Sequence, residues 1–191
     1  MSIQQVINYV NQFIPKNYTI ISFKEQHKTL LYDFIKEEKD CHDAKISPPG
    51  LLIFNNLNDE LMAYIAYSIN ITNETREDLE HEQFLGIDLS CTGIKYRRKQ
   101  LSTYLRIVLF LYAIQNNIKY IASDVNPSSQ SLLKKFHFKG DIGNYLEEFN
   151  WIYSSRVNTN NTKFKKAVND FFRNKKIKPE QKKKTIRKKS Y

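Results

Sequence analysis

Residues 84–113 read FLGIDLSCTGIKYRRKQLSTYLRIVLFLYA, and residues 118–138 read IKYIASDVNPSSQSLLKKFHF. The first stretch starts as an apolar, strand-like segment, passes through a basic turn and continues as a long helix that is apolar nearly all round. The second stretch holds a short strand followed by a short helix. Strands that alternate with helices in this order predict a β-α-β unit with covered parallel strands. This unit decides the fold.

Shorter elements surround the unit. Toward the N-terminus, apolar spacing and β-rich runs predict helices at residues 3–13 and 24–39 and strands at residues 18–23, 51–54, 60–69 and 81–92. The unit itself adds a helix at 101–114, a strand at 119–125 and a helix at 128–136, and a last strand is expected at 145–154. Antiparallel strands that lead into a β-α-β-α-β segment predict one mixed α/β (α+β) sheet with helices on both faces.

Positive charge is concentrated at the C-terminus. Residues 163–191 hold thirteen Lys or Arg and two acidic residues, a net charge of +11, whereas the other 162 residues carry −1 of the total of +10. Apolar residues at helical spacing between Phe164 and Phe172 predict an amphipathic helix over residues 162–174. Residues 175–191 have almost nothing to bury, which predicts a disordered basic tail. Such a tail could bind nucleic acid weakly, sit on an anionic membrane, direct nuclear import or simply keep the protein soluble.

Cysteine usage and the N-terminus bear on the compartment. Cys41 and Cys91 could form one disulfide, but two cysteines in a domain of this size more often remain thiols in a reducing compartment. The N-terminus lacks the basic and apolar regions of a signal peptide, and the most apolar run is shorter than the roughly 20 residues that span a bilayer. The four histidines are scattered without metal-binding spacing. These features predict an intracellular protein, cytoplasmic or nuclear, without a transmembrane segment or a metal site.

The stretch at residues 84–138 resembles the acetyl-CoA-binding core of the GNAT superfamily of N-acetyltransferases. In that family a strand leads to a loop of the form Gln/Arg-x-x-Gly-x-Gly/Ala and a long helix, and a second strand leads to an Asn and a short helix that closes in Gly-Phe. The order and spacing here are similar. The resemblance implies a divergent GNAT member, with a GNAT-like domain at 1–160, a C-terminal helix at 161–174 and the tail at 175–191.

The resemblance also implies a site for acetyl-CoA, the acyl donor, whose diphosphate the family binds at the N-terminus of the long helix. Gln100 and Ser102 occupy the two small-residue positions of the loop, and a side chain at position 100 is costly if that position needs a positive φ. Three consecutive cations, Arg97 to Lys99, favour a bound diphosphate; the alternative is a solvated basic turn. Asn126 matches the family's Asn near the CoA arm, and its alternative role is a helix cap. The matching cofactor-binding residues are Arg97, Arg98, Lys99, Gln100, Leu101, Ser102 and Asn126.

The resemblance further implies a general base for the attacking amine, because many members of the family have a carboxylate for this purpose on or just before the strand that precedes the loop. Asp88 and Glu82 are the candidates; Asp88 lies deeper in the strand, and either could also be a solvated strand acid. The position of the family's Tyr acid falls on Leu133, which cannot donate a proton, and His137 stands where the family has Gly before the closing Phe138.

Two hypotheses follow from these residues. One is an acetyl-CoA-dependent N-acetyltransferase that modifies a primary amine of a protein or a small molecule. The other is a catalytically inactive GNAT-fold protein, structural or associated with nucleic acid, that acts through its basic tail at residues 175–191.

Overall fold

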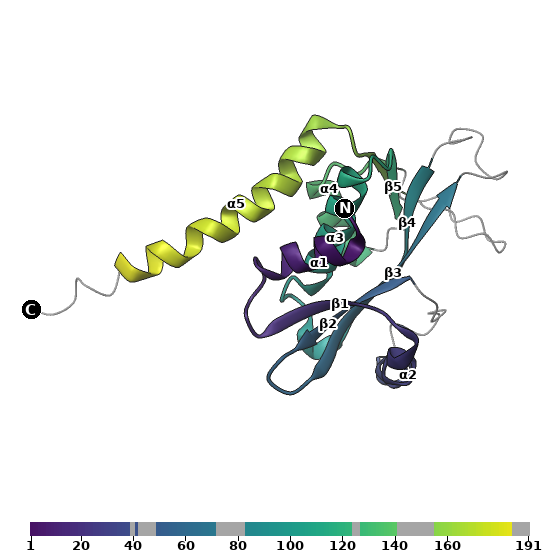
Figure 1. The fold of residues 1–191 in the computed structure, drawn as a ribbon, viewed down its shortest axis with the longest axis vertical. Coiled ribbons are helices and arrows are strands. Elements are labelled where there is room, and N and C mark those ends of the chain that lie inside the picture. Colours follow the sequence, from purple (N-terminus) through teal and green to yellow (C-terminus); the bar gives the residue numbers. More distant parts are fainter. Residues whose placement is uncertain (39–40, 42–48, 72–82, 124–126, 141–154, 185–191) are drawn as a thin grey trace, which may run out of the picture.

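The computed structural model describes residues 1–38, 41, 49–71, 83–123, 127–140 and 155–184. Its centre is a six-stranded sheet with the strand order β1-β2-β3-β4-β5-β6. Neighbouring strands are antiparallel except β4 and β5, which are parallel. This is the mixed α/β sheet that the sequence predicts, and its parallel pair belongs to the β-α-β unit (Figure 1).

The elements follow the expected order. The strands are β1 (Tyr18–Ser22), β2 (Gly50–Asn55), β3 (Glu60–Ile71), β4 (Gln83–Thr92), β5 (Tyr120–Ser123) and β6 (Ser155–Asn158). The helices are α1 (Ile3–Asn11), α2 (Lys28–Glu37), α3 (Leu101–Gln115), α4 (Pro127–Lys135) and α5 (Thr162–Lys184), and short 3-10 helices stand before α2 at Glu25–His27 (η1) and before α3 at Ile94–Tyr96 (η4).

Helices cover both faces of the sheet, and each face has its own hydrophobic core. On one face α1, α3, α4 and α5 pack around Phe110. The rings of Phe136, Phe138 and Phe164 have their centroids 5.0, 5.5 and 5.4 Å from that of Phe110. On the other face α2 closes a smaller core that includes Phe34. The closing phenylalanine of the quoted stretch therefore serves packing.

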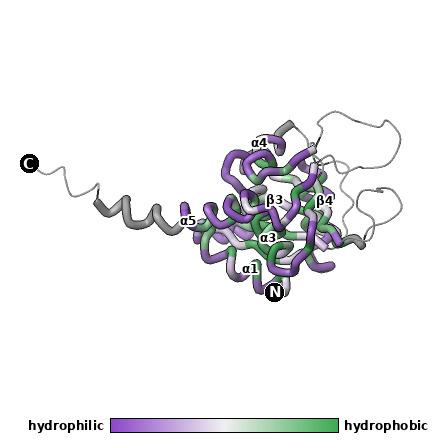
Figure 2. Tube along the Cα trace, turned by 90° about the horizontal axis from the view of Figure 1, so that it is seen from above, coloured by the Kyte–Doolittle hydropathy of each residue, from purple (hydrophilic) through white to green (hydrophobic). Residues whose placement is uncertain are grey.

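Helix α3 is the centre of the larger core. Nine of its fifteen residues are buried, which explains why its sequence is apolar nearly all round. In the hydropathy view it forms the most hydrophobic helix of the molecule, surrounded by other elements (Figure 2). Its N-terminus, where the basic loop enters, is thereby fixed against β4.

Helix α5 uses the apolar spacing of its first half to pack on the body. Phe164, Val168 and Phe172 are buried, and the Phe172 ring lies 5.4 Å from Tyr9 and 5.0 Å from Phe13 beside α1. The helix runs to Lys184, past residue 174, where the sequence analysis ends it. Its C-terminal end points away from the sheet (Figure 1).

The last strand differs from the prediction. It lies at Ser155–Asn158, antiparallel to β5, whereas the predicted strand at 145–154 falls outside the described residues. Val157 is its one large apolar side chain, so the strand has no β-like pattern and depends on pairing with β5. The Thr159 hydroxyl supports it by donating to the Ile118 carbonyl at 2.7 Å. None of the described helices is long and apolar enough to cross a membrane.

Candidate functional site

The second half of β4 extends beyond the described part of β5. The last described backbone pair of the two strands is Ile87–Ser123, and β4 continues to Thr92 beside β3. On the side that faced β5, the N–H and C=O groups in the second half of β4 have no strand partner in the described part of the chain. Such groups need hydrogen-bond partners when water is excluded. An extended ligand with amide groups could pair with this edge as another strand would.

A β-bulge lies at the same point. Ala66 pairs with Leu89 and Tyr67 pairs with Ile87, so Asp88 is the extra residue of β4. The bulge changes the alternation of side chains, because Leu89 packs in the core under α2 although Ile87, two residues earlier, packs in the core under α3. Asp88 is therefore the bulged residue of β4, one position beyond the last described pair of β4 with β5.

Asp88 is exposed on the α2 face of the sheet. Its carboxylate accepts a hydrogen bond of 3.0 Å from the Ser68 hydroxyl on β3. Burial, and then the charge of Asp88, raise the pKa of Tyr64 to about 12. The Tyr64 side chain is fully buried, and its hydroxyl has no hydrogen-bond partner among the described residues. The site thus offers an accessible carboxylate next to a phenol that stays protonated at neutral pH.

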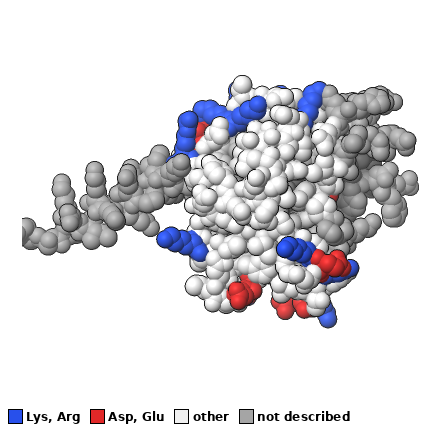
Figure 3. Space-filling view, in the orientation of Figure 1, with Lys and Arg blue, Asp and Glu red and all other residues white. Residues whose placement is uncertain are grey.

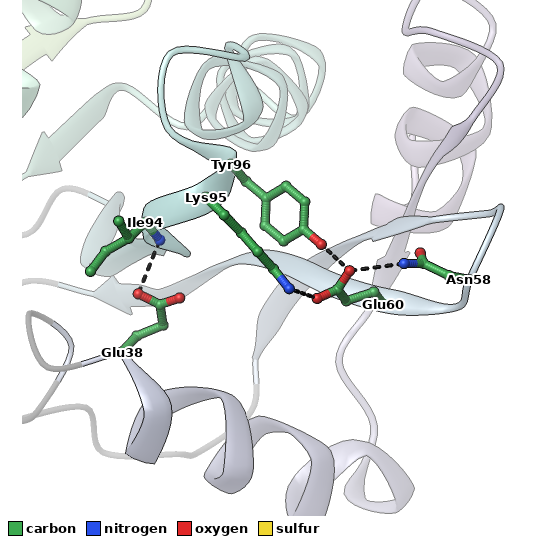
Figure 4. A network of polar contacts seen from close by, with 6 residues as sticks. All are labelled: Glu38, Asn58, Glu60, Ile94, Lys95 and Tyr96. Carbon is green, nitrogen blue, oxygen red and sulfur yellow. Dashed lines mark hydrogen bonds and ion pairs between the residues drawn. The ribbon is translucent and has the colours of Figure 1, made fainter.

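Two carboxylates hold the turn that follows β4 (Figure 4). Glu60, at the start of β3, accepts a hydrogen bond from the Tyr96 hydroxyl and forms an ion pair with Lys95. Glu38, which follows α2, accepts a 3.0 Å hydrogen bond from the Ile94 N–H. The bonds from Lys95 and Tyr96 lower the pKa of Glu60 to about 2. Through these contacts β3 and α2 fix η4, and with it the start of the basic loop.

The loop after η4 surrounds the N-terminus of α3 with cations. Arg97, Arg98, Lys99 and Gln100 are exposed, and Arg98 and Gln100 have left-handed φ values of 65° and 64°. Gln100 is the N-cap residue, and its side chain makes no capping hydrogen bond. The first bond into the helix runs from the Tyr104 N–H to the Gln100 carbonyl at 3.0 Å, so the N–H groups before Tyr104 lack an intrahelical acceptor. Such N–H groups, together with the positive end of the helix dipole, are an arrangement that can bind an anion.

Cys41 and Cys91 form a disulfide, with Cα atoms 5.9 Å apart. This corrects the expectation of two thiols. Cys91 lies near the end of β4 and Cys41 follows α2, and both are buried in the core under α2. The bond ties the chain after α2 to the second half of β4. The sequence allows this pairing but does not favour it, because only the packing of α2 on this face brings the two residues together.

Known proteins resemble this chain in structure but not in sequence. No protein-family model and no curated protein matches it. A ribosomal-protein-S5-alanine acetyltransferase from Vibrio fischeri is 12% identical, with 78% of this chain and 96% of that chain covered and a TM-score of 0.55. A GNAT-family acetyltransferase from Listeria monocytogenes is 11% identical, with 74% and 94% covered and a TM-score of 0.51. The chain has the GNAT fold. Arabidopsis thaliana Naa50, in complex with the bisubstrate analogue CoA-Ac-MVNAL, is 13% identical, with 73% and 95% covered and a TM-score of 0.50.

Several predicted site residues of this GNAT fold lie in the second half of β4 and in the loop that leads to α3. Asp88 is in β4, and residues 97–100 form the end of that loop. Leu101 is 1% exposed and packs into the core, whereas Ser102 is half-buried in the first turn of α3. The predicted site residues Glu82 and Asn126 lie outside the described residues.

Helix α4 contributes packing to the GNAT fold. Leu133, at the position of the family's Tyr acid, is 2% exposed in the core under α3. His137, at the position of the family's Gly, has a φ of 60°. The N–H groups of His137 and Phe138 bond to the Lys134 and Leu133 carbonyls at 3.0 and 3.1 Å, which closes α4 as a Schellman motif. Position 137 therefore requires a left-handed backbone, which Gly adopts more readily than His.

Two residues of this region, Glu60 and Arg106, have contacts that become apparent only in the structure. Glu60 looks like an ordinary acid at a strand end, and only the fold brings it to η4. Arg106 interrupts the apolar run of α3. The sequence did contain one indication of a role for Arg106: it is a charged residue in a helix that is apolar nearly all round. Charged side chains are rarely buried unless other groups compensate the charge.

Proposed function

We propose that this protein transfers an acetyl group from acetyl-CoA to a primary amine of a protein or a small molecule. The observation that carries the proposal is the second half of β4, which begins at the bulge at Asp88 and has no strand partner on its β5 side among the described residues. From Asp88 to Thr92 an extended strand covers about 13 Å, at ~3.3 Å per residue. A ligand that lies along this edge and still reaches the basic loop must be long, like an acylated pantetheine arm that ends in a diphosphate.

The N-terminus of α3 suits the diphosphate end of such a ligand. Its N–H donors lack an intrahelical acceptor, and three cations, Arg97 to Lys99, precede them. Anions bind at such helix ends because the N–H groups and the helix dipole act together. The Naa50 structure of similar fold was solved with an analogue that contains CoA, which supports the assignment of the acyl donor.

Asp88 is the proposed general base. An alkylammonium substrate must lose a proton before its nitrogen can attack the thioester carbonyl carbon, and a carboxylate within hydrogen-bond reach can accept that proton. The C–N bond then forms, the C–S bond breaks, the nitrogen releases its second proton to solvent to give the amide, and the CoA thiolate takes a proton from solvent. No acid is needed at Leu133 for this last step, since a thiolate can leave without prior protonation.

Calorimetric titration of the full chain with acetyl-CoA tests binding. We expect saturable heat with acetyl-CoA and with CoA, and release of the CoA thiol when a primary amine that serves as acceptor is added. Candidate acceptors are short peptides with free N-termini and small primary amines. If folded protein produces no heat at millimolar acetyl-CoA, the proposal is refuted.

The charge distribution supports a second proposal, weak nucleic-acid binding through residues 175–191. Residues 163–191 carry +11 while the rest of the chain carries −1. Among the described residues, Lys and Arg side chains gather over the first half of α5 (Figure 3). We expect binding that weakens steeply with salt and is lost when the chain is cut after residue 174. Unchanged binding by the truncated protein would rule out the tail, and acetyl-CoA binding should survive the cut.

A further inference from the structure

Arg106 is a buried cation inside α3. It is 3% exposed, and among the described residues no carboxylate pairs with it. Burial lowers the pKa of its guanidinium to about 10, so the group stays charged at neutral pH. A buried charge without a counter-ion is strongly unfavourable unless other groups compensate it. The positive end of the α3 dipole, one turn away, makes the position worse rather than better for a cation.

Two serine hydroxyls contact this guanidinium. Its Nη1 donates to Ser90 Oγ on β4 at 2.9 Å and to Ser102 Oγ in the first turn of α3. The two hydroxyl oxygens lie 3.1 Å apart, and both serines are half-buried. The cluster of Ser90, Ser102 and Arg106 therefore leads from the core to the surface at the proposed anion site.

Some hydrogen-bond donors of this cluster have no acceptor within it. Ser90 and Ser102 both accept from Arg106, and one hydroxyl hydrogen at most is used between them. The other hydroxyl hydrogen remains available to an acceptor outside the cluster. The Arg106 Nε–H also has no acceptor among the described residues. The cluster thus combines an uncompensated positive charge with unused donors, and an anion would satisfy both.

We propose that Arg106 is a positioning residue for the diphosphate of the acyl donor. Through the Ser102 hydroxyl it adds a buried positive charge and an oriented donor to the anion site at the N-terminus of α3. The inference rests on the proposed function. It also gives Ser102 a role in the loop, because its hydroxyl is the link between the buried charge and the bound anion.

Arg106→Met and Arg106→Lys, compared with the wild-type chain, test the inference. Met keeps much of the side-chain volume without the charge, and Lys keeps the charge without the forked donors. The affinities for CoA and for inorganic pyrophosphate are measured by calorimetry, and the free energy of unfolding by urea titration. Arg173→Met is the matched control, since Arg173 is 77% exposed on α5.

We expect Arg106→Met to weaken CoA and pyrophosphate binding about tenfold, ~1.4 kcal/mol, without loss of stability, because the variant removes an uncompensated buried charge. Arg106→Lys should recover part of the affinity, and Arg173→Met should change nothing. A purely structural role would instead lower stability and affinity together, without recovery by Lys, and that result overturns the inference.

The outcomes separate this inference from the proposed function. If Arg106→Met binds CoA as tightly as the wild-type chain does, the inference fails and the proposed function stands. If the wild-type chain binds pyrophosphate in an Arg106-dependent way but does not bind CoA, the anion site stands and the acetyl-CoA proposal fails. If the wild-type chain binds neither ligand, both fail.

Discussion

Replacement of Gln100 by Gly tests the loop that precedes α3. Gln100 is the N-cap residue of α3 and adopts φ 64° and ψ 16°, a left-handed conformation. For an L-residue this conformation costs about 1–2 kcal/mol, because Cβ comes too close to the backbone. Glycine has no Cβ and adopts it freely. The Gln100 side chain makes no capping hydrogen bond that the substitution would remove.

The expected gain is smaller than the full conformational cost. Glycine increases the entropy of the unfolded chain, which lowers the stability by about 0.4–1 kcal/mol. The net expectation for Gln100→Gly is therefore a free energy of unfolding raised by about 0.5–1 kcal/mol. In a chain of this length that corresponds to a rise of roughly 2 °C in the melting temperature.

Gln100→Ala is the matched control, because it removes the side chain and keeps the cost of the left-handed backbone. Urea titration and thermal melting of the wild-type chain and the two variants give the order of stability. We expect Gly to be more stable than Ala at this position. If Gly is less stable than Ala, as at ordinary helical positions, then position 100 is not left-handed in solution and the account of this loop is wrong.

Three further predictions concern the base, the turn and the disulfide. Asp88→Asn should lower kcat by about 10²–10⁴ and leave the affinity for acetyl-CoA unchanged in calorimetry; an unchanged kcat would remove Asp88 from the mechanism. The hydrogen bond from Lys95 lowers the folded-state pKa of Glu60 to about 2, below the value of about 4.3 for an unfolded chain. The stabilisation by Glu60 should therefore be complete above about pH 5 and disappear toward pH 2, so the wild-type chain and Glu60→Gln should converge in unfolding free energy at low pH, and a constant difference would contradict the assignment. Replacement of Cys41 and Cys91 by Ser should lower the free energy of unfolding by roughly 2–4 kcal/mol, and reduction of the wild-type chain should reproduce the loss; insensitivity to reductant would mean that the cysteines are thiols in solution.

The sequence predicts the fold best where one pattern determines the packing. The run at residues 101–114 is apolar nearly all round, and the structure buries α3 at the centre of the larger core. The last strand escaped prediction because Ser155–Asn158 has one large apolar residue and depends on its pairing with β5. Helix α5 extends past residue 174 although the apolar spacing on which the prediction relied stops near Phe172.

The sequence predicts those parts of the candidate site whose residues are close to each other along the chain. The strand, the basic turn and the helix follow each other in the sequence, and the concern over position 100 is supported by the positive φ of Gln100. Contacts between distant segments were not predictable. Glu60 meets Tyr96 and Cys41 meets Cys91 only after β3 and α2 have packed on β4. Arg106 was visible as a charge in an apolar run, but its serine partners became clear only in three dimensions.

The position of the basic loop depends on contacts behind it as well as on its own residues. A glycine at position 100 would let the backbone adopt its turn without cost, and this chain has Gln100 there at φ 64°. The segment just before the loop is held by Glu60 and Glu38 through η4, and by Cys91 through its bond to Cys41. These contacts come from β3 and from the chain just after α2, so the segment before the loop is held from two sides. Because these contacts hold η4, the loop begins from a fixed point and the left-handed conformations fall within it, at Arg98 and Gln100. The N–H groups of α3 consequently stay aimed at one place, which is what a pre-organised anion site requires.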